Sequence, residues 1–213
     1  MFRDRDDAAR QLADHLKQLH LPHALVLGIP RGGVAIAVAL AEHLEAEADV
    51  VLARKLRAPQ QPELAIGAIS EDGEVYLTPY GQQLGADHAY LEQECEDRRA
   101  EIKRRREMFR TVRPPASIEG RSVILTDDGI ATGSTMLAAL HVVQANKPAE
   151  TIIAVPVMPA DRVDAFRDAC DRLVYLAAPR AFMAIGQFYE NFEQLDDQTT
   201  CDLLRQAAAK RIG

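Results

Sequence analysis

The chain has 213 residues, of which 47% are apolar and 27% charged, a balance typical of a globular domain rather than a disordered segment. Its formal net charge of -7 argues against a nucleic-acid partner, because binding a phosphate backbone requires a basic face. The charged N-terminus and the absence of a long apolar run predict a cytoplasmic protein with no membrane partner. The three widely spaced cysteines predict neither a disulfide framework nor a zinc site.

The first part of the chain alternates between helical and strand patterns. Apolar residues at helical spacing predict a helix over 8–20, and the apolar run at 24–27 predicts a buried strand. A second helix is expected over 34–45 and a second buried strand over 49–53. Strand and helix patterns that alternate in this way are typical of a parallel sheet.

The middle of the chain, about 56–118, has a different character. Prolines and glycines interrupt its first part, where Asp72-Gly73 lies between two short apolar segments and predicts a hairpin. Residues 87–111 are highly charged and predict a long exposed helix. We therefore expect this region to be a mobile insertion rather than part of the core sheet.

The alternation resumes in the last part of the chain. Strands are predicted at 122–126, 151–155 and 173–176, and helices at 134–145, at 161–170 and from Asp196 or Asp197 to about 210. Continuous apolar strands between helices predict a mostly parallel sheet with helices on both faces. We expect a single α/β domain over 1–213, with core strands in the spatial order 2-1-3-4-5 and a small C-terminal hood at about 178–213.

The segment 123–135 carries the most chemical information. A strand leads into two acids, then into a loop of small and hydroxyl-bearing residues, and then into a helix. Gly129 and Gly133 permit close backbone approach, and the amide groups at a helix start favour an anion. Asp127 and Asp128 would repel a phosphate, but they can accept hydrogen bonds from sugar hydroxyls or hold a hydrated Mg²⁺. The segment therefore predicts a ligand that has both a phosphate and a diol.

This segment resembles the signature of type I phosphoribosyltransferases that binds 5-phosphoribosyl-1-pyrophosphate (PRPP). The resemblance implies that Asp127 and Asp128 bind the ribose. It implies that the 5-phosphate is bound by the loop residues Gly129, Ile130, Ala131, Thr132, Gly133, Ser134 and Thr135. It also implies Mg²⁺ as cofactor, contacted by the two acids directly or through water. No general base is identifiable from the sequence.

Two further segments fit the same resemblance. The loop after the first strand ends in Arg31, Gly32 and Gly33, where glycine amides and a guanidinium suit an anion. It is similar to the pyrophosphate loop of the family, although a plain turn is the alternative. Arg54 and Lys55 follow the second strand and resemble the Arg-Lys pair of adenine-type enzymes. This likeness implies a contact with pyrophosphate, and a solvated strand end is the alternative.

The acceptor is defined less sharply. Phe182, Phe188 and Tyr189 follow the last core strand, where type I enzymes carry a variable hood that holds the base. Packing within the hood is the alternative for these rings. Ala131 occupies the place where enzymes for 6-oxopurines usually have an acid, which argues against a hypoxanthine-guanine activity. Nearly the whole chain resembles a group of bacterial predicted phosphoribosyltransferases of unsettled substrate.

The resemblance implies a Mg²⁺-dependent glycosyltransferase of nucleotide metabolism. Such an enzyme transfers the 5-phosphoribosyl group of PRPP to a nucleobase or an amine and releases pyrophosphate. The alternative is a regulatory protein on the same fold that senses PRPP or a nucleotide without catalysis, because a fold does not determine a function. A homodimer is one assembly state that the sequence allows.

Overall fold

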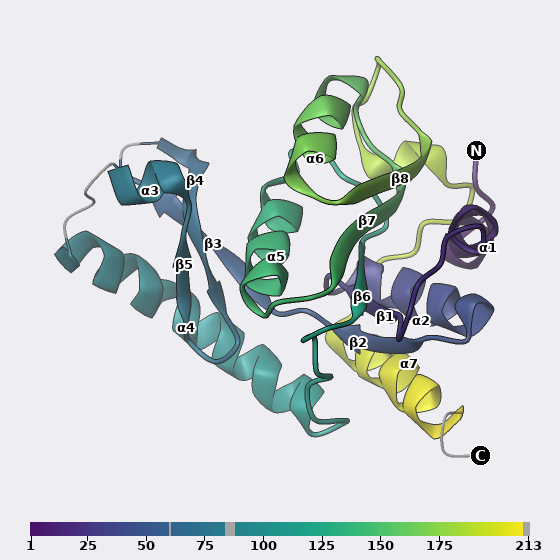
Figure 1. The fold of residues 1–213 in the computed structure, drawn as a ribbon, viewed down its shortest axis with the longest axis horizontal. Coiled ribbons are helices and arrows are strands. Elements are labelled where there is room, and N and C mark those ends of the chain that lie inside the picture. Colours follow the sequence, from purple (N-terminus) through teal and green to yellow (C-terminus); the bar gives the residue numbers. More distant parts are fainter. Residues whose placement is uncertain (60, 84–87, 211–213) are drawn as a thin grey trace.

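The computed structural model describes residues 1–59, 61–83 and 88–210, which form a core sheet with a separate arm beside it (Figure 1). The core sheet has five parallel strands in the order β2-β1-β6-β7-β8. Their bounds are β1 Leu25–Gly28, β2 Glu47–Val50, β6 Ser122–Thr126, β7 Glu150–Val157 and β8 Arg172–Ala177. Numbered along the chain, this is the order 2-1-3-4-5, so the predicted α/β fold is confirmed.

Burial of the central strands explains their unbroken apolar sequences. Every residue of β1 and β6 is buried, as are all but the first of β7, because helices cover both faces of the sheet. The register pairs Gly28 with both Val50 and Thr126. The carboxyl-terminal ends of β1, β2 and β6 therefore lie next to one another at the same end of the sheet. The loops that follow these strands begin side by side.

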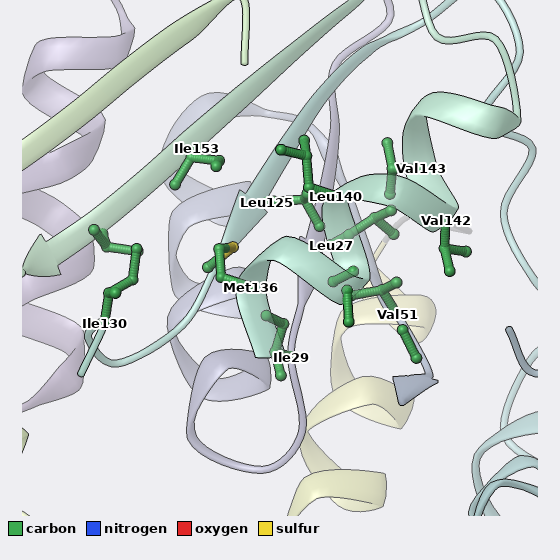
Figure 2. Close-up of a cluster of buried hydrophobic side chains, with 14 of the residues drawn as sticks. Leu27, Ile29, Val51, Leu125, Ile130, Met136, Leu140, Val142, Val143 and Ile153 are labelled. Carbon is green, nitrogen blue, oxygen red and sulfur yellow. The ribbon is translucent and has the colours of Figure 1, made fainter. Parts of the chain in front are cut away.

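The two faces of the sheet are covered by different helices. Helices α1 Arg5–Leu16 and α2 Gly32–Leu44 pack on the face that carries Val26 and Ile124. Helices α5 Ser134–Ala145 and α6 Val163–Ala169 pack on the other face, where Leu27 and Leu125 point. Figure 2 shows the second of these clusters, with side chains of α5 lying against those of β1 and β6. Successive strand residues alternate between the two cores, as the pleat requires.

The C-terminal part of the chain adds two short 3-10 helices and a last α-helix around the sheet. A short 3-10 helix η1 Ala160–Arg162 leads into α6, and a second, η2 Ile185–Phe188, lies in the predicted hood. Helix α7 Asp197–Lys210 packs against α2 and the edge strand β2. Within the described part of the chain, no helix is both long enough and apolar enough to cross a membrane.

The predicted insertion forms the arm, which projects to one side of the core in Figure 1. Its antiparallel sheet has the order β3-β4-β5 and is followed by two helices. The bounds are β3 Ala53–Ala58, β4 Gln61–Ser70, β5 Val75–Leu77, α3 Pro79–Gln83 and α4 His88–Arg110. The hairpin predicted at Asp72-Gly73 is confirmed, since Gly73 adopts a φ of 84° between β4 and β5.

One strand boundary was predicted wrongly. The apolar run at 49–53 suggested one strand, but β2 ends at Val50 and Ala53 already belongs to β3 of the arm. Val51 and Leu52 between them are buried without belonging to either strand. An apolar run indicates burial, and burial here continues past the point where the sheet ends.

The charged helix α4 is exposed on its outer face only. Glu94, Cys95, Ile102 and Phe109 are buried, so the predicted exposed helix has an inner side that the prediction did not include. Mobility of the arm stays a prediction. Residue 60 and residues 84–87 of the predicted insertion lie outside the described residues, as do residues 211–213 of the predicted tail.

Candidate functional site

The acid pair lies directly after β6, against the first turn of α2. Asp127 Oδ1 accepts the amide of Asp128 at 2.8 Å, and Asp127 also accepts the amide of Gly33. A Cβ on Gly33 would lie only 2.7 Å from the carbonyl oxygen of Thr126, and one on Gly32 would collide with the Asp128 carboxylate. Two successive glycines are therefore needed to bring the first loop against the acids.

This contact joins two segments that the sequence suggested separately. The structure places Gly32 and Gly33 beside Asp127 and Asp128. There the Gly33 amide donates a hydrogen bond to the Asp127 carboxylate. A direct contact of the two glycines with pyrophosphate stays a prediction. Arg31 precedes α2 and is exposed, and the peptide bond between Pro30 and Arg31 is cis.

Arg5 at the start of α1 is a site residue that sequence reasoning missed. Its Nη2 and Nε donate to Asp128 Oδ2 at 3.0 and 3.3 Å, across 123 residues of sequence. Its Nη1 donates to the carbonyl of Glu193 at 2.9 Å, and its guanidinium lies 4.3 Å from the centroid of the Phe192 ring. The Arg5 and Asp128 side chains are only 12% and 13% exposed. No local pattern marks Arg5, because its partners are all distant in sequence.

Tyr189 contacts the backbone of the same acid, Asp128. Its hydroxyl donates to the carbonyl oxygen of Asp128 at 2.7 Å. Its ring is buried between Phe2 and Phe192, with centroids 5.3 and 5.0 Å away. Burial, followed by the charge of Asp128, raises the pKa of Tyr189, so the hydroxyl remains a donor. The structure thus gives Tyr189 a packing role, and its contact with an acceptor base stays a prediction.

The other two predicted hood aromatics pack on each other. The ring centroids of Phe182 and Phe188 are 5.3 Å apart, and both rings are partly exposed. Such a tilted pair is a common stable arrangement of aromatic side chains. Their contact with a base also stays a prediction.

The surroundings of Asp127 and Asp128 disfavour a negative charge on both carboxyl groups at once. Burial, followed by the charge of Asp128, raises the pKa of Asp127 well above its usual range. Burial also raises the pKa of Asp128, although the Arg5 guanidinium acts in the opposite direction. Adjacent carboxyl groups at a site of low polarity are costly to ionise together. Ionisable groups whose pKa values are strongly shifted by burial and by a neighbouring charge are common at functional sites.

The loop between Asp128 and α5 packs against the core at Gly129, Ile130 and Gly133. The amide of Ile130 donates to the carbonyl of Val157 at 2.9 Å, and the Ile130 side chain enters the core, as Figure 2 shows. Gly133 adopts a φ of 82°, and a Cβ there would meet the ring of Phe166 at 2.5 Å. The packing of Ile130 and Gly133 against the core therefore determines the path of the loop.

The hydroxyl-bearing residues occupy the outer side of this loop. Thr132 and Thr135 are exposed, and Thr132 Oγ1 lies 3.3 Å from Ser134 Oγ. Ser134 and Thr135 begin α5, where amide groups lack intrahelical acceptors, and Thr132 lies just before it. The start of α5 therefore offers an anion both amide and hydroxyl donors.

Arg54 and Lys55 belong to the arm. They are the second and third residues of β3, and Arg54 Nη2 donates to Glu101 Oε1 of α4 at 2.5 Å. Arg54 Nη1 donates to the carbonyl of Ala53 at 3.0 Å. The Arg54 guanidinium lowers the pKa of Glu101, so this ion pair persists near neutral pH. A ligand phosphate at Arg54 would have to share this side chain with Glu101, a partner that the sequence did not reveal.

The chain is similar in sequence to known proteins. Residues 3–181 match the family model of the phosphoribosyl transferase domain. The chain is 43% identical over 210 residues to Rv0571c of Mycobacterium tuberculosis (strain H37Rv), provisionally named a phosphoribosyl transferase, and equally to MT0597 of strain CDC 1551. These alignments cover 97% of this chain and 47% of the relatives, so the chain spans about half their length.

A solved structure is similar over almost its full length. The crystal structure of TT1426 from Thermus thermophilus matches with a TM-score of 0.93 and 42% identity. The match covers 96% of this chain and 98% of that chain. Both the core and the arm therefore belong to an architecture that another protein shares.

Proposed function

The chain belongs to the phosphoribosyl transferase domain family, and from that premise we propose that it transfers the 5-phosphoribosyl group of PRPP to a nitrogen nucleophile. One observation carries this proposal. The half-buried acids Asp127 and Asp128 lie at a strand end, and a helix start rich in donors follows them. The ligand that suits such a site has a diol next to a phosphate, as PRPP has.

The division of labour follows from the donors and acceptors. Asp127 and Asp128 accept hydrogen bonds from the ribose hydroxyls. The first turn of α5, with its hydroxyls, binds the 5-phosphate at the positive end of the helix dipole. Arg31 from the core, with Arg54 and Lys55 from the arm, contributes positive charge for the pyrophosphate group.

Magnesium fits this site as an ion that arrives with its substrate. No group of three or more His, Cys, Asp or Glu able to hold a metal occurs in residues 1–59, 61–83 and 88–210. Arg5 already occupies one oxygen of Asp128. Mg²⁺ keeps several waters and commonly binds one or two carboxylates together with substrate phosphates. Asp127 and Asp128 would hold it through water, and the ion would neutralise charge on the departing pyrophosphate.

In the reaction, a nitrogen lone pair forms a bond to C1 of the ribose while the bond from C1 to pyrophosphate breaks. In this proposal the carboxylates stabilise the positive character that develops on the sugar, and the arginines stabilise the negative charge that gathers on pyrophosphate. Stabilising such developing charge is the largest contribution in many enzymes. The acceptor is proposed as a nucleobase or an amine, and a homodimer and a cytoplasmic location remain predictions.

The test is release of pyrophosphate from PRPP and Mg²⁺ with a panel of purines, pyrimidines and amines. We expect at least one acceptor to give turnover that is lost in a variant with Asp127→Asn and Asp128→Asn. Asp161→Asn, a change at an exposed acid of η1, is the control and should keep full activity. Tight PRPP binding without turnover on any acceptor would replace the enzyme by a PRPP sensor, and absence of PRPP binding would refute both.

A further inference from the structure

The N-terminal segment is joined to the hood beside the acid pair. The amide of Phe2 donates to the carbonyl of Phe188 at 2.8 Å, and the amide of Glu190 donates back to the carbonyl of Phe2 at 2.8 Å. These bonds form a parallel bridge between Phe2 and Tyr189. Two segments from opposite ends of the chain therefore meet where Asp128 is held.

The start of α1 is fixed just after this bridge. The Asp4 carboxylate accepts the amide of Asp7 at 2.8 Å and caps the helix. Arg5 follows the cap directly, so its backbone is held by the bridge on one side and by the helix on the other. The planar guanidinium is pre-organised, so it loses less freedom for each hydrogen bond that it forms, which favours accurate placement.

The guanidinium is also restrained at its three nitrogens and on one face. Phe192 lies against its face, the Glu193 carbonyl accepts Nη1, and the remaining two donors converge on one oxygen of Asp128. Tyr189 holds the carbonyl of the same aspartate. Asp128 is thus fixed at both its side chain and its backbone by residues of the N-terminal segment and the hood.

We propose that Arg5 is a positioning residue for ribose recognition, which holds the Asp128 carboxylate in the orientation that accepts the sugar hydroxyls. The inference rests on the proposed function. Without the guanidinium, two adjacent carboxylates in a poorly solvated place would repel each other, and Asp128 would turn away. Arg5 would then matter for ligands that carry the diol and not for phosphate as such.

The alternative is that Arg5 only joins α1 to the hood. Calorimetry separates the two, with ribose 5-phosphate, 2-deoxyribose 5-phosphate and inorganic phosphate as the ligands. Arg5→Gln should weaken ribose 5-phosphate binding by about 10- to 100-fold, the loss expected for a charge-assisted hydrogen bond. It should leave the affinity for inorganic phosphate unchanged, and it should reduce the preference for ribose over deoxyribose.

Two further variants complete the test. Arg5→Lys should restore part of the ribose 5-phosphate affinity, because it keeps the charge but loses the planar fork. Arg10→Ala, which removes another arginine of α1 that pairs with Asp7, should change neither affinity. If Arg5→Gln does not fold, the comparison of Arg5→Lys with wild type decides the matter by the same selective loss.

The outcomes are distinguishable. Equal weakening of ribose 5-phosphate and inorganic phosphate, or no weakening of either, would overturn the role of Arg5 and leave the proposed function intact. A wild-type protein that binds neither ribose 5-phosphate nor PRPP would overturn the proposed function and this inference with it. Selective loss of the diol-bearing ligand supports the positioning role.

Discussion

At the scale of single residues, the acid pair combines a proposed role in binding with a cost in stability. The pKa of Asp127 is raised, first by burial and then by the charge of Asp128. A raised pKa means that the folded state binds more protons than the unfolded chain above the ordinary Asp pKa of 3.8. The contribution of this carboxyl to stability therefore falls as pH rises through that window up to the raised pKa.

Asp127→Asn should accordingly raise the melting temperature of the ligand-free protein at about pH 7, because it removes a charge that its half-buried site disfavours. The difference from wild type should shrink as the pH falls toward the ordinary Asp pKa, where both side chains are neutral. Thermal unfolding across this pH range is the measurement. A variant that melts below wild type at neutral pH would show that the amides of Gly33 and Asp128 favour the charged form more than burial opposes it.

Gly133 is a second residue whose identity the fold dictates. It combines a φ of 82° with close contact to Phe166, whereas Gly73 has a φ of 84° and nothing within 4 Å of an added Cβ. Gly73→Ala should therefore cost only the left-handed conformation, about 1 kcal/mol. Gly133→Ala adds a collision in the core and should cost about 3 kcal/mol. Urea unfolding of both variants tests this, and equal losses would show that Phe166 moves aside freely.

At the scale of elements, Arg110 fastens the arm to the core. This last residue of α4 donates from Nη1 to Asp49 of β2 at 3.0 Å and from Nη2 to Glu71 of the β4–β5 turn at 2.6 Å. Asp49 is 1% exposed and also accepts the amide of Ala116. A core strand, an arm hairpin and an arm helix thus share one guanidinium.

Arg110→Met should destabilise the protein by about 3 kcal/mol, because it leaves the Asp49 charge buried with too few partners. Arg106→Met is the matched control one turn earlier, where the pair with Asp72 is 51% and 63% exposed, and it should cost less than about 1 kcal/mol. Chemical denaturation measures both. A similar small loss in the two variants would mean that Arg110 does not hold the arm.

At the scale of the whole molecule, the arm carries two of the cations proposed for pyrophosphate, Arg54 and Lys55. If they bind it, we expect the arm to close toward the ligand at the core. Hydrogen exchange should then decrease across 56–113 when Mg²⁺ and PRPP are added, with the largest change at the end of the arm distant from Arg110. Peptides from α6 serve as the control and should not change. Equal exchange in both states would refute closure of the arm.

Much of this fold was determined by local sequence. The strand predicted at 122–126 and the helix predicted at 134–145 have the bounds of β6 and α5. They could be predicted because apolar runs, helical periodicity and glycines act over a few residues. The acids and the hydroxyl-rich loop could be proposed as a site for the same reason, since they lie within one continuous segment.

Tertiary structure decided the rest. The end of β2 depended on which neighbour the chain pairs with, and the inner face of α4 depended on the arm sheet beneath it. Arg5, Tyr189 and Glu101 gained their roles from partners that lie 123, 61 and 47 residues away. Side chains meet across such distances only when the whole core has formed, because packing of distant segments, rather than local preference, brings their charges together.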